Sequence, residues 1–203
     1  EMHLMKEGKY EVAKAYILYR EKQNEKRDEH KEELLSQFEH QSMQVTKADG
    51  RKELFDIKKI KAVFDRAAVG YEKDCTFKDL IEAFKKNIVA DIKTTDISKL
   101  LVKTCIDLVT VENIFWQNIA ARILLGDLYK KATKNRGIEQ KDIYSPLAYQ
   151  KLFDDYIAQG LYYKDFYQYY SKEDILEAGK HLSRDTDTSY EYTTIVSFIK
   201  RYL

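Results

Sequence analysis

Apolar residues recur at helical spacing through the middle of this chain and predict four successive helices between residues 57 and 131. The first helix has the i, i+3, i+4, i+7 spacing at Ile60, Val63, Phe64 and Ala67. The second carries Phe77, Leu80, Ile81, Phe84 and Ile88, and the third carries Ile97, Leu100, Leu101, Cys105 and Leu108. The fourth is expected from about Val111 to Lys131, and we expect it to be central because its middle is apolar on most sides.

Polar residues and glycine mark where these helices begin and end. Asp56 is placed to cap the first helix, and Gly70 is expected to end it as a C′ glycine. The string Thr76-Phe-Lys-Asp79 is a capping pattern for the second helix, and Thr94-Thr-Asp96 begins the third. These signals separate the helical region into short elements that can fold back on one another.

A β-hairpin is predicted immediately before the first helix. Val45 to Lys47 can form one strand and Arg51 to Phe55 the return strand. Asp49-Gly50 between them is a strong hairpin signal, because both turn positions need a positive φ and glycine adopts it without steric cost. The predicted order in this region is therefore a hairpin followed by a helical bundle.

The hairpin and the start of the first helix carry a mixture of charges. Glu53 and Asp56 are the acids there, and the cations are Lys47, Arg51, Lys58 and Lys59. Such a mixture suits a nucleotide, since cations pair with phosphates and a carboxylate accepts hydrogen bonds from sugar hydroxyls. The alternative is a surface hairpin whose charges are solvated.

The segments on either side have different patterns. Residues 11–20 predict a helix whose apolar face needs a partner, whereas residues 21–33 are nearly all charged or amide residues and predict a solvated helix extension or linker. Leu34, Leu35 and Phe38 are expected to pack that segment on the following domain. Further along, Ser171-Lys-Glu-Asp174 predicts another capped helix.

Tyrosines are concentrated in the last third, where eight of the sixteen lie between Tyr144 and Tyr170. Interleaved aromatics and lysines can form a base-stacking surface. The interpretation that we favour is a core or interface built from tyrosines, because Asp154, Asp155 and Asp165 would repel a phosphate backbone.

Composition narrows the class of protein. The 203 residues are 44% hydrophobic and 34% charged, with one proline and seven glycines, which is typical of a helical, charge-rich protein. A net charge of +1 argues against a nucleic-acid-binding surface. No signal peptide and no apolar run long enough to cross a membrane are found, so we expect no membrane association and a cytoplasmic location.

Metal and disulfide chemistry is not indicated. Cys75 and Cys105 are isolated, without a Cys-x-x-Cys pair, and Cys105 is expected to be a small core residue. The four histidines show no metal-ligand spacing. We therefore expect no metal site.

Three blocks in order resemble the ATP-cone, the small regulatory domain of ribonucleotide reductases. They are Val45-Thr-Lys-Ala-Asp-Gly-Arg-Lys-Glu-Leu-Phe-Asp-Ile-Lys-Lys-Ile60, Ile92-Lys-Thr-Thr-Asp-Ile97, and Asn118-Ile-Ala-Ala-Arg-Ile123 followed by Leu-x-x-Leu-Tyr-Lys130. The resemblance implies a mainly α fold, in which residues 45–133 form a four-helix bundle lidded by a small β-hairpin or three-stranded sheet. An all-helical segment then follows.

The flanking segments also resemble parts of such reductases. Residues 8–20 resemble the last helix of another ATP-cone, which implies that residues 1–24 end a truncated preceding cone and that 25–44 are a charged linker. Residues 134–203 resemble the helical region before the catalytic barrel of class I large chains, through Arg184-Asp185, Ser189-Tyr190 and Arg201-Tyr-Leu203. This implies a fragment of a ribonucleoside-diphosphate reductase that lacks the barrel and is not itself active.

The resemblance also implies a nucleotide site for ATP as activator or dATP as inhibitor, bound with Mg²⁺. Glu53 matches the acid that takes a ribose hydroxyl. Phosphate contacts are implied for Lys47, Lys59, Thr94 and Lys130, and adenine contacts for Phe55, Asp56, Ile60 and Ile97. The implied partners are further copies of the chain and the small radical-generating reductase chain.

Two residues depart from the family pattern and leave open an alternative to nucleotide binding. Ala48 stands where the family usually has a basic residue, and Ser98 stands where a histidine can help to sense the sugar. The alternative is a degenerate cone that binds no nucleotide and acts as a structural or oligomerisation module. A cone-bearing transcription repressor would need a zinc ribbon that this sequence lacks, and residues 184–203 favour class I over an anaerobic reductase.

Overall fold

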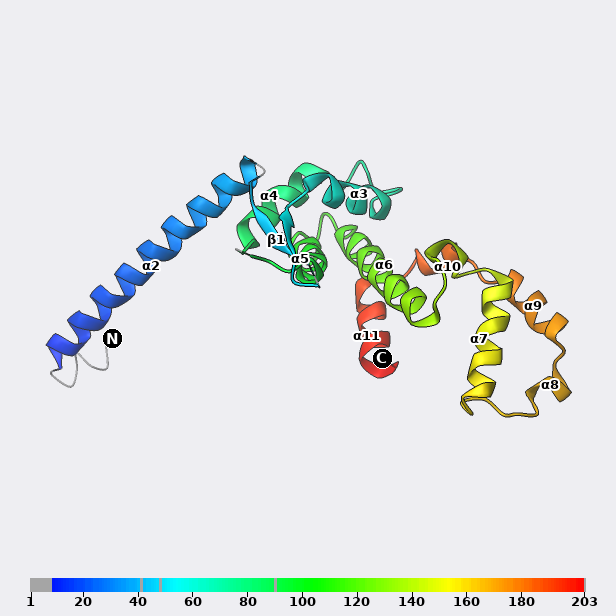
Figure 1. Ribbon diagram of the computed structural model, residues 1–203. Coiled ribbons are helices and arrows are strands. Elements are labelled where there is room, and N and C mark those ends of the chain that lie inside the picture. Colours follow the sequence, from blue (N-terminus) through cyan, green and yellow to red (C-terminus); the bar gives the residue numbers. More distant parts are fainter. Residues whose placement is uncertain (1–8, 41, 48, 90, 203) are drawn as a thin grey trace.

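The protein is mainly helical, with one small antiparallel sheet (Figure 1). A computed structural model describes residues 9–40, 42–47, 49–89 and 91–202. The elements are α2 Tyr10–Glu39, β1 Gln44–Thr46, β2 Lys52–Leu54, α3 Ile57–Ala67, α4 Phe77–Asn87, α5 Thr94–Asp107, α6 Trp116–Arg136, α7 Pro146–Ala158, α8 Phe166–Tyr169, α9 Lys172–Lys180, α10 Arg184–Asp187 and α11 Tyr192–Tyr202, with a 3₁₀ turn at Gln140–Asp142. The predicted mainly α fold, with four helices after a hairpin, is confirmed.

The hairpin has the predicted position and turn. β1 and β2 pair antiparallel with Val45 opposite Glu53, and Gly50 in the turn has a φ of 83°. Thr46 also forms a single parallel bridge with Lys93, just before α5. In the described residues, the sheet therefore has two strands, and one bridge stands in place of the third strand of the expected lid.

The predicted capping residues lie at the starts of α3, α4 and α9. The Asp56 side chain accepts a hydrogen bond from the Lys58 amide at 2.9 Å, and Thr76 Oγ1 accepts one from the Asp79 amide at 3.2 Å. Ser171 and Asp174 form a reciprocal capping box at the start of α9. Each cap satisfies amide groups that the first turn of a helix cannot pair internally.

We expect Thr76→Ala to lower the free energy of unfolding by about 1 kcal/mol, because the α4 amides lose their side-chain acceptor. Urea denaturation followed by circular dichroism measures the change. Thr193→Ala, at an exposed position within α11, is the matched control and should change stability by less than about 0.5 kcal/mol. Equal effects of the two substitutions would contradict the capping role.

Two predicted boundaries were wrong. The fourth helix begins at Trp116 rather than near Val111 and continues to Arg136, where Gly137 adopts the left-handed conformation. Its start is displaced because Asn113 donates from its side chain to the Asp74 carbonyl and holds the preceding residues in a turn. Gly70 has a φ of 86° but lies beyond Ala68, the residue that caps α3, so it does not occupy the C′ position.

The main core lies between the hairpin and helices α3 to α6. Phe84, Leu80, Ile119 and Cys105 are fully buried there. The Phe84 ring lies 6.2 Å from the Phe55 ring after β2, and both contact Phe38 at the end of α2. These three rings attach the hairpin and the long first helix to the bundle.

Helix α2 runs without a break over 30 residues, so the charged segment is a helix extension through residue 39. It contains neither glycine nor proline, and its mixed charges suit a solvated helix. As expected, Phe38 is buried in the core of the following domain. Leu34 is also buried, whereas Leu35 is only partly buried. The first half projects away from the bundle (Figure 1) and exposes its apolar residues Tyr10, Val12, Tyr16, Leu18 and Tyr19.

The last third forms two units. Helix α11 returns to α6, where Ile195 is buried against Ala121 and Leu125. Helices α7 to α9 form a separate hairpin-like unit (Figure 1), in which the Phe153 ring lies 5.1–5.2 Å from the rings of Tyr149, Tyr162 and Phe166. Many tyrosines of this region therefore pack on one another, whereas Tyr163 and Tyr169 are exposed. No helix in the described part of the chain could span a membrane.

Candidate functional site

A carboxylate between two ammonium groups forms the centre of the candidate site. On β2, Glu53 Oε2 lies 2.7 Å from Lys47 Nζ, and Oε1 lies 3.4 Å from Lys59 Nζ at the start of α3. Hydrogen bonding from Lys47, followed by that from Lys59, holds the pKa of Glu53 below its usual value. The hairpin register explains this grouping, since Glu53 faces the same side of the sheet as Val45, and Lys47 lies two residues further along the chain.

The start of α5 lies beside this group. The bridge between Thr46 and Lys93 places Thr94, the first residue of α5, next to Lys47 in register. Lys93 is the N-cap residue but makes no side-chain capping bond, because an ammonium group cannot accept one. A helix N-terminus without a side-chain cap presents amide donors and partial positive charge, which favour an anion.

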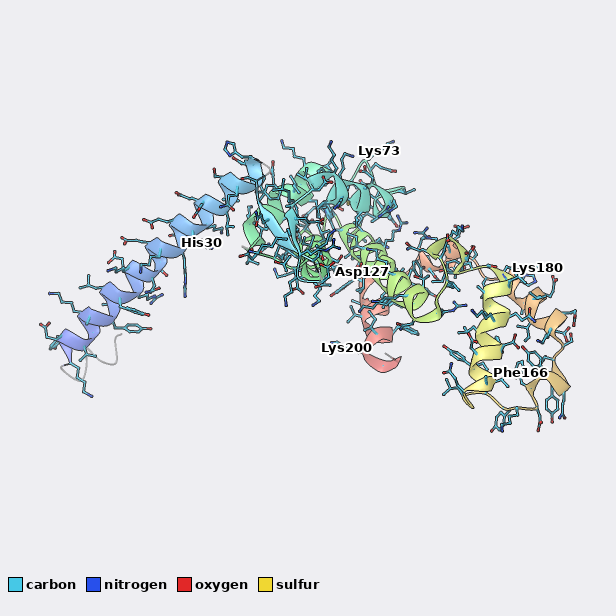
Figure 2. All side chains as sticks on the ribbon, viewed as in Figure 1. His30, Lys73, Asp127, Phe166, Lys180 and Lys200 are labelled. Carbon is cyan, nitrogen blue, oxygen red and sulfur yellow. The ribbon has the colours of Figure 1, made fainter. Side chains whose placement is uncertain are left out.

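Helix α6 supplies the next group of charges. Asp127 Oδ1 accepts from Ser98 Oγ at 3.4 Å and from Lys130 Nζ at 3.2 Å. Asp127, labelled in Figure 2, therefore joins α6 to α5 one turn beyond Thr94. Lys130 is exposed, so its ammonium group can exchange this partner for another anion.

The apolar residues assigned to adenine contact are core residues. Phe55, Ile60 and Ile97 are only 6%, 5% and 9% exposed, and all belong to the main core. Asp56 is exposed, and its Oδ1 accepts from the Lys58 amide as the cap of α3. The structure thus groups Lys47, Glu53 and Lys59 at the hairpin and the start of α3, with Thr94 beside Lys47 in register. Phe55, Ile60 and Ile97 lie in the core, Lys130 lies on α6, and Ala48 lies outside the described residues.

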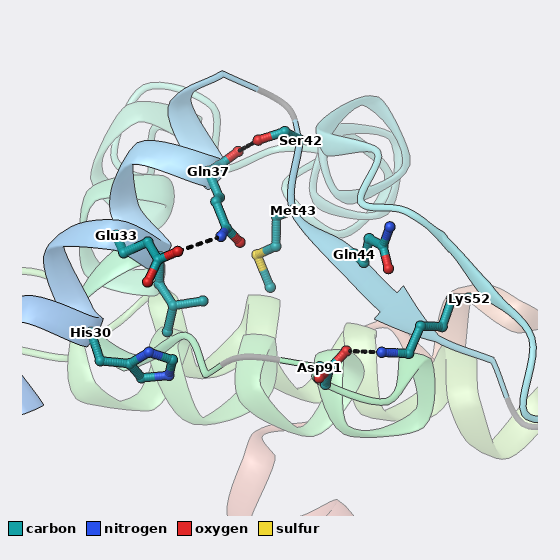
Figure 3. A pocket seen from close by; sticks show the side chains of 9 residues that line it. His30, Glu33, Gln37, Ser42, Met43, Gln44, Lys52 and Asp91 are labelled. Carbon is teal, nitrogen blue, oxygen red and sulfur yellow. Dashed lines mark hydrogen bonds and ion pairs between the residues drawn. The ribbon is translucent and has the colours of Figure 1, made fainter.

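Cavities lie on two sides of this region. Figure 3 shows one of about 490 Å³ between α2 and the hairpin. Its polar groups include the Lys52–Asp91 ion pair at 2.7 Å and the Gln37–Glu33 hydrogen bond. Lys52 lies on the opposite face of the hairpin from Glu53. This cavity is therefore separate from the charged group described above.

The second cavity, of about 510 Å³, extends from Ser98 and Lys130 toward α10. Arg122 and Arg184 line it, and neither is among the site residues predicted from the sequence. Arg122 could have been noticed as the one charged residue within the apolar segment 119–125. Arg184 was considered only as part of a resemblance, and nothing local indicated that it lies near Lys130.

Neither a resident metal nor a reactive thiol is indicated. Among the described residues, no group of three or more His, Cys, Asp or Glu side chains could hold a metal ion. Cys75 and Cys105 are buried, and burial raises the pKa of the Cys75 thiol to about 11 and that of Cys105 further. Both cysteines are therefore core residues rather than nucleophiles.

The donor set suits a phosphorylated ligand with a sugar. Three lysines, one threonine and a helix N-terminus can pair with phosphate oxygens, and Glu53 can accept from hydroxyl groups. The arrangement therefore suits the binding of such a ligand.

Comparisons with known proteins identify a domain family and several relatives. The family described as ATP cone domain matches residues 43–131. The chain is 26% identical over 164 residues to the ribonucleoside-diphosphate reductase 1 subunit alpha of Salmonella typhimurium, covering 81% of this chain and 20% of that protein. It is 28% identical over 170 residues to the ribonucleoside-diphosphate reductase subunit alpha of Synechocystis, covering 83% and 21%. It is 25% identical over 164 residues to the ribonucleoside-diphosphate reductase 1 subunit alpha of Escherichia coli, covering 81% and 20%.

The chain thus spans about a fifth of the length of these relatives. The match includes the hairpin, α3, α4, α5 and most of α6, which carry all nine candidate residues. Residues 43–131 are an ATP-cone domain, carried in a chain that is homologous to the alpha subunits of ribonucleoside-diphosphate reductases.

Proposed function

We propose that the ATP-cone of this chain binds ATP or dATP and forms part of the regulatory region of a ribonucleoside-diphosphate reductase large chain. ATP would activate and dATP would inhibit the conversion of ribonucleotides to deoxyribonucleotides. The observation that carries the proposal is the grouping of Lys47 and Lys59 around Glu53, with Thr94 beside Lys47 in register. Lys130 is linked to α5 through Asp127 and Ser98. No residue of the cone takes part in the reductase chemistry itself.

Binding would exchange ion-pair partners within the site. Lys47 and Lys59, which pair with Glu53, would turn to phosphate oxygens, and the carboxylate would accept from ribose hydroxyls. Thr94 would donate from the first turn of α5. Mg²⁺ would be carried on the phosphates, since the described side chains offer no three-ligand cluster for it. Asp56 and the edges of Phe55, Ile60 and Ile97 would contact the adenine.

The proposed assembly follows from the relatives. We propose that the whole protein self-associates and pairs with a small radical-generating chain in the cytoplasm, and that it binds neither nucleic acid nor membranes. Residues 1–24 would belong to a preceding cone, 25–44 would be a charged connection, 45–133 the cone, and 134–203 the helical region that precedes the barrel. The exposed apolar residues in the first half of α2 support the preceding cone.

A second candidate function is a structural cone without a ligand. It is favoured by the fact that each candidate lysine already has a carboxylate partner, Glu53 for Lys47 and Lys59, and Asp127 for Lys130. The alanine at position 48 also removes one cation that the family usually has. A single titration separates the two functions.

Calorimetric titration of the chain with ATP and with dATP, both with Mg²⁺, is expected to show saturable binding. We expect Lys59→Ala to weaken that binding ten- to a hundredfold, because a charge-assisted phosphate contact contributes about 1.5–3 kcal/mol. Lys61→Ala is the matched control, since Lys61 lies on the same helix and pairs with Asp65 at 2.7 Å. Absence of heat and of thermal stabilisation at millimolar nucleotide would favour the structural cone instead.

A further inference from the structure

The cavity beside α6 is shared by Lys130 of the candidate site and by residues of α10, a helix outside the family match. Val63, one turn beyond Lys59 on α3, and Ser98, one turn beyond Thr94 on α5, line its near side together with Lys130. Residues of α10 line its far side, including Arg184. Lys130 is the one of the nine candidate residues that lines the cavity, so an anionic group bound by Lys130 would lie at its edge.

The charges around the cavity favour an anion. Four cations line it, namely Arg66, Arg122, Lys130 and Arg184, against the two acids Asp127 and Asp185. The Arg122 guanidinium is already hydrogen-bonded within the protein, since its Nη1 donates to the carbonyls of Ala67 and Val69 at 2.8 and 2.7 Å. Arg66 is exposed. Lys130 and Arg184 are therefore the cations best placed for a ligand that enters from the cone.

Arg184 lies over the ring of the tyrosine that precedes Lys130. Its guanidinium carbon lies 5.9 Å from the centre of the Tyr129 ring, and Tyr129 precedes Lys130 on α6. The Tyr129 hydroxyl donates to Asp187 at 2.6 Å, and Tyr144 donates to the same carboxylate oxygen. The ring is therefore fixed against α10, and a guanidinium that stacks on a fixed ring keeps its donors at the ring edge available.

We propose that Arg184 is a further polyphosphate-binding residue, which reaches the nucleotide from α10 across this cavity. The proposal rests on nucleotide binding by the cone. It assigns to the segment after the cone a direct contact with the ligand, and it supplies a cation to a site whose hairpin has alanine at position 48. The nucleotide would then touch both the cone and α10 and would stabilise the docking of one on the other.

The test uses the 203-residue chain and nucleotides of different phosphate number. ATP and AMP are titrated with Mg²⁺ into the unchanged protein, Arg184→Gln, Arg184→Lys and Lys59→Ala, and AMP is measured by displacement where its heat is small. Arg184→Gln is expected to weaken ATP ten- to a hundredfold and AMP by less than about threefold, because AMP lacks the distal phosphates. Arg184→Lys keeps the charge and should recover part of the loss.

Lys180→Gln is the matched control. It removes a cation from α9, where Lys180 pairs with Glu177, and it lies well away from Asp127 in Figure 2. It should leave both affinities unchanged. Thermal unfolding of each variant without nucleotide checks that the fold is kept.

The outcomes separate the two proposals. If the unchanged protein binds no ATP, nucleotide binding by the cone fails and this inference fails with it. If Lys59→Ala loses ATP while Arg184→Gln keeps it, only the role of Arg184 is overturned. If Arg184→Gln weakens ATP and AMP equally, or lowers the unfolding temperature and both affinities together, Arg184 is structural and the inference is again overturned.

Discussion

Replacing Phe84 with alanine is expected to lower the free energy of unfolding by about 3–5 kcal/mol. The Phe84 side chain is fully buried, and its ring lies 6.2 Å from the Phe55 ring and 6.5 Å from that of Phe38. Alanine would remove apolar contacts and leave a cavity that three separate elements border, so relaxation of one element cannot fill it. Urea denaturation at 25 °C measures the change.

Tyr163→Ala provides the comparison for Phe84, because Tyr163 is also aromatic but 89% exposed. It should change stability by less than about 0.5 kcal/mol. Phe84→Leu should fall between the two, since leucine retains much of the buried apolar volume. A loss below about 1 kcal/mol for Phe84→Ala would show that the three-ring contact does not hold α2 and the hairpin on the bundle.

Arg122→Lys is expected to lower the free energy of unfolding by about 2–4 kcal/mol, although the charge is kept. The guanidinium donates to the Ala67 and Val69 carbonyls at the end of α3 and to the Thr188 carbonyl after α10. One ammonium group cannot reproduce this fork. Lysine would also weaken the stacking on Tyr71, whose ring centre lies 4.8 Å from the guanidinium carbon.

Hydrogen exchange gives a second measurement for Arg122→Lys. Because the arginine joins α6 to the residue after α10, exchange should rise around α10 and at the end of α3 before it rises in α4. Arg66→Lys is the control, since Arg66 is exposed and lines the same cavity. A uniform loss of protection in Arg122→Lys, or an equal effect of Arg66→Lys, would contradict the local role.

The sequence predicted the elements that depend on local chemistry. The hairpin follows from Asp49-Gly50, and the starts of α3, α4 and α9 follow from side chains that cap their own helices. The start of α6 was misplaced because a contact between Asn113 and the distant Asp74 holds the chain in a turn there. No local pattern in residues 111–115 reports such a contact.

In the candidate site, as in the fold, the local groupings were predictable and the tertiary contacts were not. Glu53, Lys47 and Lys59 belong to one hairpin and its following helix, so their proximity follows from strand register and turn chemistry. The contacts of Asp127 and Arg184 were not predicted, because both arise where α6 meets other elements. Sequence spacing does not encode such tertiary proximity.

The length of α2 has a mechanical consequence. At 1.5 Å per residue its 30 residues measure about 45 Å, and only its last turns, through Leu34 and Phe38, are seated on the cone. A helix attached at one end acts as a lever, so a tilt of about 10° at the Phe38–Phe55 contact carries the far tip through about 8 Å. Phe55 directly precedes Asp56 and links the hairpin to α2 through Phe38. A small rearrangement of the hairpin would therefore become a large displacement of the N-terminal end of α2.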